Sequence, residues 1–325
     1  MDDATVTAVS PPWGALPVEQ YLIRNWDTSS SLPVPAQTRG LVASFLHNLA
    51  EIPSSWDATT SRGSQQQPQA LDREPTPQEI STILAPWRDV QLRDVALQLW
   101  RDRHHGTANE AVWVRTYFPA SDPSTKSAAD DKFQEWIALD RERDPNFEEA
   151  TLSWRILDDP SILSSGQGGA GSDDSWEPVF GVLPELAGPS QSLSRKPGGG
   201  NPALQEELDE LRQQLQELQA AEGGEGDFEA ETTDAGIQLQ ELAVGSFLLV
   251  ADAHAFGSDR LRLLFLDARG NIVRESRILV GEIHVLKGEW FRSSWSDTED
   301  WWLGGEVGVN YRADSAVGKE LYGTT

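Results

Sequence analysis

Four polar side chains that follow two predicted strands are the strongest candidates for chemistry in this sequence. Asp158 and Asp159 follow an alternating apolar segment, while Asp252 and His254 follow a continuous apolar run. Ligands of open α/β sheets bind beyond the carboxyl ends of the strands, so these groups converge if the two strands are neighbours. Three carboxylates and an imidazole could hold a divalent cation or transfer protons. The alternative is structural, because aspartates often cap a turn before a proline, here Pro160.

Other kinds of chemical site are poorly represented. His104 and His105 are adjacent, so on a helix they point in different directions, and no third metal ligand lies at a useful spacing. They also suit the negative end of a helix dipole. Cysteine is absent, which excludes disulfides and thiolate chemistry. The glycine-rich stretches 166–171 and 198–200 do not precede Lys-Ser/Thr, so they are not phosphate loops. The sequence therefore assigns no cofactor.

The elements that would position the strand-end groups alternate between strand and helix. A period of two or a continuous apolar run marks five predicted strands: residues 112–118, 152–156, 247–251, 261–266 and 272–278. Between the first two strands, Asp130–Arg143 has helical spacing. Gly270 is suited to a hairpin turn between the last two. This order predicts an α/β fold, with α+β as the alternative, built on a mixed sheet flanked by helices.

The composition predicts three regions along the 325 residues. Residues 1–110 form an N-terminal helical region with flexible loops, in which 88–103 is the clearest helix. Residues 111–163 and 245–325 form one discontinuous α/β domain. Residues 164–244 interrupt it as a long, disordered, acidic low-complexity insert with a short heptad helix.

The insert combines negative charge with an apolar seam. From residue 202 to 235 there are 11 acidic residues and one basic residue, which supplies −10 of the net charge of −26. Leucines spaced four and three residues apart over little more than two heptads predict a helix with one apolar seam. Such a helix could pair with another copy of the chain or with a partner protein; the alternative is a single helix exposed to solvent. The seam consists of Leu204, Leu208, Leu211, Leu215 and Leu218.

Four tryptophans lie close together near the end of the chain: Trp290, Trp295, Trp301 and Trp302. Tryptophan is prominent in the hot spots of protein interfaces, so the cluster could form a recognition surface. The alternative is that these side chains form the core of a compact tail. Acidic residues among them indicate that one face of the segment is solvated.

The overall charge limits the kinds of partner. A net charge of −26 repels phosphate backbones and anionic membrane surfaces, which disfavours nucleic-acid and membrane partners. It suits a basic protein partner, or it serves solubility alone. The N-terminal residues are acidic and resemble no secretory signal, and the most apolar stretch, 242–256, is interrupted by polar residues. The expected location is therefore the cytosol or the nucleus.

Four short segments of the predicted sheet form a recognisable pattern: Val114–Phe118, Asp158–Pro160, Phe247–Ala253 and Leu263–Asp267. In order and spacing the pattern resembles a family of small uncharacterised α/β domains, a domain of unknown function found in bacteria and fungi. Tyr117 stands where the family has aspartate, and the family lacks the long insert. The resemblance implies an α/β domain and no established activity, so it transfers no functional residue.

Two functions from different classes follow from these observations. The first is a non-catalytic protein-interaction or scaffold protein that uses the acidic insert or the Trp-rich tail. The second is a metal-dependent enzyme or small-ligand binder that uses Asp158, Asp159, Asp252 and His254. The sequence contains neither Gly-x-Ser-x-Gly nor His-Glu-x-x-His, and this lack of a catalytic motif favours the first.

Overall fold

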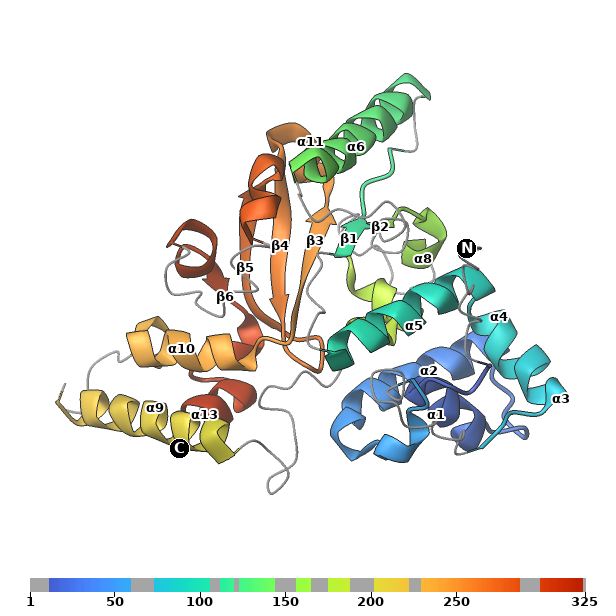
Figure 1. Cartoon of the computed structure of the whole chain (residues 1–325), viewed down its shortest axis with the longest axis horizontal. Coiled ribbons are helices and arrows are strands. Elements are labelled where there is room, and N and C mark those ends of the chain that lie inside the picture. Colours follow the sequence, from blue (N-terminus) through green and yellow to red (C-terminus); the bar gives the residue numbers. More distant parts are fainter. Residues whose placement is uncertain are drawn as a thin grey trace, which may run out of the picture. The chain divides into compact units, whose positions relative to one another are not determined.

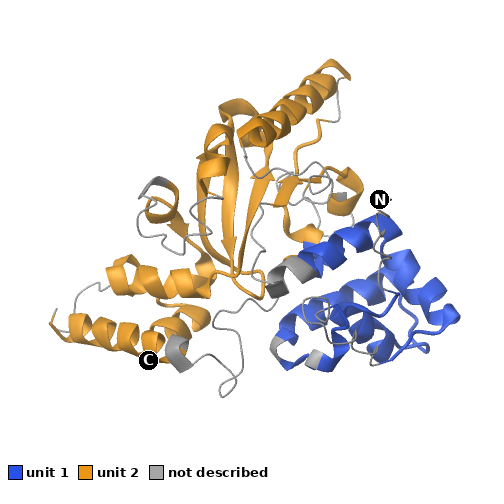
Figure 2. Ribbon diagram, in the orientation of Figure 1, with its two compact units in different colours: residues 1–108, 180–185 blue, residues 109–179, 186–325 orange. Residues whose placement is uncertain are grey.

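The chain divides into two compact units (Figure 2). Unit 1 comprises Met1–Ala108 and Phe180–Glu185, and unit 2 comprises Asn109–Val179 and Leu186–Thr325. Six residues of the predicted insert therefore belong to the helical unit, which the sequence did not predict. The computed structural model describes residues 12–59, 73–105, 112–119, 123–143, 156–164, 175–187, 202–221, 229–286 and 299–323.

Unit 1 is built from helices whose starts are encoded locally. Thr76 and Glu79 form a capping box, in which each side chain bonds the other residue's backbone N–H, at 3.2 and 2.8 Å. The predicted helix 88–103 begins at Val90, where Asp89 accepts a bond from the backbone N–H of Leu92 at 2.7 Å. The helices are α1 Pro17–Asn25, α2 Val34–His47, η1 Leu49–Glu51, η2 Ser54–Trp56, α3 Pro77–Glu79, the π-helical turn η4 Ile80–Leu84, α4 Ala85–Trp87 and α5 Val90–His105.

Unit 2 contains a mixed sheet, which confirms the predicted α/β fold (Figure 1). The strand order is β2-β1-β3-β4-β5-β6, with β2, β1 and β3 parallel and the remaining pairs antiparallel. The strands are β1 Val112–Arg115, β2 Ile156–Leu157, β3 Ser246–Ala251, β4 Arg260–Leu266, β5 Ile272–Leu279 and β6 Glu306–Val307.

The local sequence explains the strand boundaries. Every residue of β3 is buried, which accounts for its continuous apolar run. Strand β1 ends at Arg115, because the backbone N–H groups of Thr116 and Tyr117 both bond the carbonyl of Ala251 instead of continuing the ladder. The β4–β5 turn contains Gly270 at a φ of 81°, the left-handed conformation expected of a hairpin glycine.

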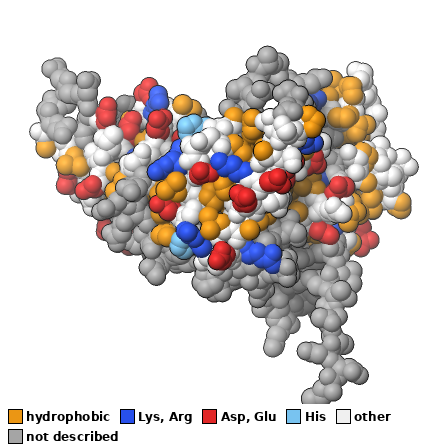
Figure 3. All heavy atoms as spheres, turned by 90° about the horizontal axis from the view of Figure 1, so that it is seen from above, with side chains coloured by type: hydrophobic (Ala, Val, Ile, Leu, Met, Phe, Trp, Pro, Cys, Tyr) orange, Lys and Arg blue, Asp and Glu red, His pale blue; other side chains and the backbone are white. Residues whose placement is uncertain are grey.

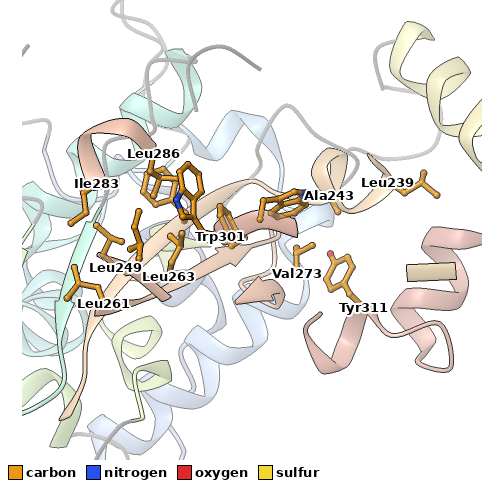
Figure 4. Packing of buried hydrophobic residues seen from close by; sticks show 14 of the residues in the cluster. Leu239, Ala243, Leu249, Leu261, Leu263, Val273, Ile283, Leu286, Trp301 and Tyr311 are labelled. Atoms are coloured by element: carbon orange, nitrogen blue, oxygen red, sulfur yellow. The ribbon is translucent and has the colours of Figure 1, made fainter. Parts of the chain in front are cut away.

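Helices from the insert and from the C-terminal segment share one hydrophobic core with this sheet. Leu239 and Ala243 of α10 (Asp234–Ala243) lie in the same cluster as the strand residue Leu249 and as Trp301 and Tyr311 (Figure 4). The sequence predicted one helix in the insert, whereas two long ones, α9 and α10, are present. The remaining elements are α6 Pro123–Arg143, α8 Pro160–Ser164, η5 Glu177–Gly181, η6 Pro184–Leu186, α9 Pro202–Ala221, η7 Ala230–Thr232, α10 Asp234–Ala243, α11 Ala253–Ser258, η8 Val280–Glu282, η9 Glu299–Leu303, η10 Val309–Tyr311 and α13 Ala316–Tyr322.

Candidate functional site

The carboxyl ends of β1 and β2 meet at a buried arginine that was not among the predicted site residues. Arg115 ends β1, and its side chain is 2% exposed. Its Nη2 lies 2.7 Å from Oδ1 of Asp130, and its Nη1 lies 3.3 Å from Oδ1 of Asp158. Its Nε donates to the carbonyl of Tyr117 at 3.0 Å. Asp158 therefore pairs with a cation of its own chain. An arginine within an apolar strand segment is the sequence feature that could have revealed this pair.

Aromatic rings enclose the Arg115 guanidinium. Its central carbon lies 4.8, 5.3 and 5.5 Å from the ring centres of Phe118, Phe133 and Phe256. Such contacts stabilise a desolvated cation. Burial raises the pKa of Asp158 above its usual value, and the attraction of Arg115 offsets only part of this effect. The arrangement is a buried arginine, lined by aromatic rings and paired with two partly exposed carboxylates.

Asp252 has two structural roles at the end of β3. Its Oδ1 accepts a bond from the backbone N–H of Ala255 at 2.9 Å and so caps α11. Its two carboxylate oxygens also accept bonds from Nη1 and Nη2 of Arg277, at 2.7 and 2.6 Å. Burial raises the pKa of Asp252, but the hydrogen bonds from Arg277 and Ala255 outweigh it, so the net pKa is lowered. Asp252 is held as a paired carboxylate.

The predicted site required the strands that precede its two pairs of residues to be neighbours in the sheet, and they are not. Strand β1 lies between β2 and β3, so the strands that precede Asp158 and Asp252 are not neighbours. Asp159 caps a turn by accepting a bond from the backbone N–H of Ser161 at 2.8 Å, and His254 is exposed. Within the described residues, no group of three or more Asp, Glu or His side chains is placed to hold a metal ion. Acidic and basic side chains are also intermingled on the face shown in Figure 3.

The leucine seam of α9 packs inside its own chain. Leu208, Leu211 and Leu215 are 4%, 6% and 1% exposed and belong to the core cluster that includes α10. Leu218 is 45% exposed, and the side chain of Leu204 lies outside the described residues. The three buried leucines are therefore core residues, which corrects their prediction as contacts for another chain.

The outer face of α9 is acidic. Its one basic residue, Arg212, donates from Nε to the carbonyl of Leu321 at 2.9 Å and from Nη2 to that of Glu320 at 3.1 Å. Arg212 thus bonds the last turn of α13, so it is directed toward the chain. Hydrogen bonds between side chains four residues apart, such as Gln213 to Glu217 at 2.9 Å, order the outer surface. Five exposed carboxylates line this helix: Glu206, Glu207, Asp209, Glu210 and Glu217.

The tryptophans that can be placed are core residues. Trp302 is fully buried, and its ring packs edge-on against Phe265 at a centroid distance of 4.9 Å. Trp301 is 9% exposed and belongs to the same cluster. The prediction that this pair forms a recognition surface is therefore corrected. Trp290 and Trp295 lie outside the described residues, as do the side chains of His104 and His105.

A buried polar chain connects α10, β5 and the C-terminal segment, and its residues were not among the site residues predicted from the sequence. Arg274 donates from Nε to Oε1 of Gln240 at 2.6 Å and from Nη1 to the carbonyl of Trp302. Gln240 bonds the hydroxyl of Tyr322 at 2.8 Å, and that hydroxyl donates to the carbonyl of Tyr311 at 2.8 Å. These bonds satisfy polar groups that burial would otherwise make costly.

Glu241 lies beside this chain and titrates near neutrality. Burial raises its pKa from 4.5 to about 7, and the attraction of Arg274 offsets only part of that shift. Because the folded-state pKa is raised, the stability linked to Glu241 is fully present below pH 4.5 and is lost as the pH rises through about 7.

The variant Glu241→Gln should therefore flatten the pH dependence of the melting temperature. The wild type is expected to lose more stability than the variant between pH 4.5 and pH 7. Melting curves across this interval measure the difference, and Glu210→Gln on the exposed face of α9 is the control. Identical pH profiles of the wild type and Glu241→Gln would contradict the assignment.

Comparison with protein-family models, curated proteins and solved structures finds no significant match to this sequence. The resemblance of four segments to a family of uncharacterised α/β domains stays a prediction. Among the described helices, none has the combination of length and apolar character that a membrane span needs. Function is therefore inferred from the geometry of the described residues.

Proposed function

We propose that this chain is a non-catalytic protein-interaction or scaffold protein that binds a basic partner through the outer face of α9. One observation carries the proposal. The inner leucines of α9 are buried in the chain's own core, while five carboxylates face solvent on the same helix. An anchored helix presents its charges in a fixed arrangement, so little conformational entropy is lost when a partner binds. Complementary charge then gives specificity and a fast association rate.

The charge balance of α9 supports a partner with Lys or Arg side chains. The single arginine of the helix bonds the carbonyls of Leu321 and Glu320 and lies 3.6 Å from one carboxylate, that of Asp209, so the five carboxylates still give the helix a net negative charge. The same charge disfavours nucleic acid and anionic membranes as partners. A cysteine-free sequence suits the cytosol or nucleus, which is the location we propose.

The alternative function, a metal-dependent enzyme or small-ligand binder, has weaker support. It needs free carboxylates at the strand ends, whereas Asp158 pairs with Arg115, Asp252 pairs with Arg277, and Asp159 caps a turn. These roles explain the aspartates without a ligand.

Neutralising α9 should weaken partner capture. The double variant Glu206→Gln/Glu210→Gln removes two exposed charges one helical turn apart and leaves the buried leucines intact. We expect recovery of the partner to fall roughly tenfold, because each exposed ion pair contributes at most about 1 kcal/mol. The measurement is affinity purification of the full chain from its native cell, with quantitative mass spectrometry.

A matched control separates the α9 surface from net charge. Asp131→Asn/Glu135→Gln on α6 also removes two exposed carboxylates with the same helical spacing. Partners of the α9 surface should be retained by this control. If both double variants lose the same proteins to the same extent, net charge alone drives binding, and the proposal fails.

A further inference from the structure

Unit 1 holds a short segment from the middle of the chain through specific polar contacts. The segment Phe180–Glu185 belongs to unit 1, although the residues before and after it belong to unit 2. The indole Nε1 of Trp87 donates to the carbonyl of Gly181 at 2.8 Å. Arg88 reaches the carbonyl of Val182 at 3.4 Å from Nη1.

The carboxylate of the segment forms a buried ion pair with Arg88. Nη1 of Arg88 donates to Oε2 of Glu185 at 3.0 Å, and Nη2 lies 2.9 Å from Oε1, within ion-pair distance. The side chains of Arg88 and Glu185 are 0% and 1% exposed, so solvent screens this pair little.

The residues that bind the segment are positioned by unit 1 itself. The guanidinium of Arg88 stacks 4.1 Å from the ring centre of Trp87. Glu19 lies 3.6 Å from Arg88 and is fixed by Arg93 at 2.7 Å and by the backbone N–H of Gly14 at 2.7 Å. Because these contacts come from residues 14–93, they preorganise the surface independently of the segment.

The backbone just before Trp87 carries a second, independent feature. Ile80–Leu84 forms a π-helical turn directly before the short helix α4. π-helical turns are rare and occur frequently at functional sites. Here the turn directly precedes the three-residue helix that ends in Trp87, with Arg88 as its extended C-cap.

From these contacts we infer that unit 1 is a peptide-binding module, occupied by Phe180–Glu185 as an intrachain ligand. The hydrogen bonds to two backbone carbonyls do not involve peptide side chains, so they allow many peptide sequences. Arg88 requires a carboxylate in the peptide. Leu183 and Pro184 are buried, so we expect apolar residues at the two positions before that carboxylate. The partner that fits is an acidic peptide with apolar residues directly before its carboxylate. This surface is distinct from the α9 face, and its test does not depend on that proposal.

The test uses the full chain with the segment released. Leu183→Asp/Glu185→Gln places a charge at a fully buried position and removes the carboxylate, while Trp87, Arg88 and Glu19 stay unchanged. The probe is a fluorescein-labelled synthetic peptide of residues 178–187, with binding followed by fluorescence anisotropy. We expect saturable binding to the released variant and at least about tenfold weaker binding to the wild type, whose own segment competes at a high effective concentration.

Two further measurements alter one partner each of the Arg88–Glu185 ion pair. A probe peptide carrying Glu185→Gln, and a released chain that also carries Arg88→Gln, should each lower affinity at least about tenfold. Equal affinity of both peptides, no binding to a released variant with unchanged circular dichroism, or equal binding to the wild type would each overturn the inference. Loss of helical signal on release would overturn it too, because the segment would then be part of the core of unit 1.

Discussion

The variant Glu19→Ala is expected to lower the free energy of unfolding of unit 1 by about 3–5 kcal/mol, the usual cost of removing one partner from a buried ion pair. Glu19 is fully buried and lies 2.7 Å from Arg93 and 3.6 Å from Arg88. It also accepts the backbone N–H of Gly14. Its removal takes away the carboxylate that lies beside both guanidinium groups, while Glu185 still pairs with Arg88.

Urea unfolding followed by circular dichroism measures this effect. Glu51→Ala changes an exposed glutamate of the same unit and should shift stability by less than about 0.5 kcal/mol. The expected pattern is an early helical transition in Glu19→Ala alone. A loss below about 1 kcal/mol would show that the buried ion pairs contribute little net stability.

The second large effect concerns the anchor of α9. Leu215→Ala is expected to destabilise unit 2 by about 2–5 kcal/mol, because it removes a side chain that is 1% exposed within the core cluster. Detachment of α9 would also free its acidic face from a fixed geometry, so partner capture should fall although no charge has changed.

Leu218→Ala is the matched control on the same helix. Leu218 is 45% exposed, and its truncation should change stability by less than about 0.5 kcal/mol and leave partner capture intact. Thermal melts and affinity purification are applied to both variants. Similar stability losses from the two leucines would contradict the buried position of Leu215.

The sequence predicted the elements of the sheet better than their arrangement. The alternating and continuous apolar runs correspond to β1, β3, β4 and β5, because strand patterning depends on local burial. The strand order was not predicted. The site hypothesis needed the strands before Asp158 and Asp252 to be neighbours, but β1 lies between them. Pairing between strands that are far apart in the sequence decides this order, and local hydrophobic periodicity does not predict such pairing.

The buried ion pairs were equally inaccessible to local pattern reading. Glu19 meets Arg93 across 74 residues, and Arg88 meets Glu185 across 97. Spacing rules along a helix relate residues three or four apart, so they do not identify such partners. The structural alternative for Asp159, a turn cap, was available from the sequence because capping is local.

The heptad pattern identified the correct helix and the wrong partner. Leucines at four- and three-residue spacing predict an apolar seam, and Leu208, Leu211 and Leu215 form one. The pattern does not specify whether the seam is covered by another chain or by its own, and here α10 and the core cover it. The adjacent acidic residues then remain outside, which is the basis of the proposed function.

The salt dependence of partner capture tests the central claim most directly. The wild type and the α6 control Asp131→Asn/Glu135→Gln should recover the same partners at low and physiological ionic strength and lose them together as the salt concentration rises well above the physiological range. Glu206→Gln/Glu210→Gln should recover little at either ionic strength. Recovery that is insensitive to salt and unchanged in Glu206→Gln/Glu210→Gln would contradict a basic partner on the outer face of α9.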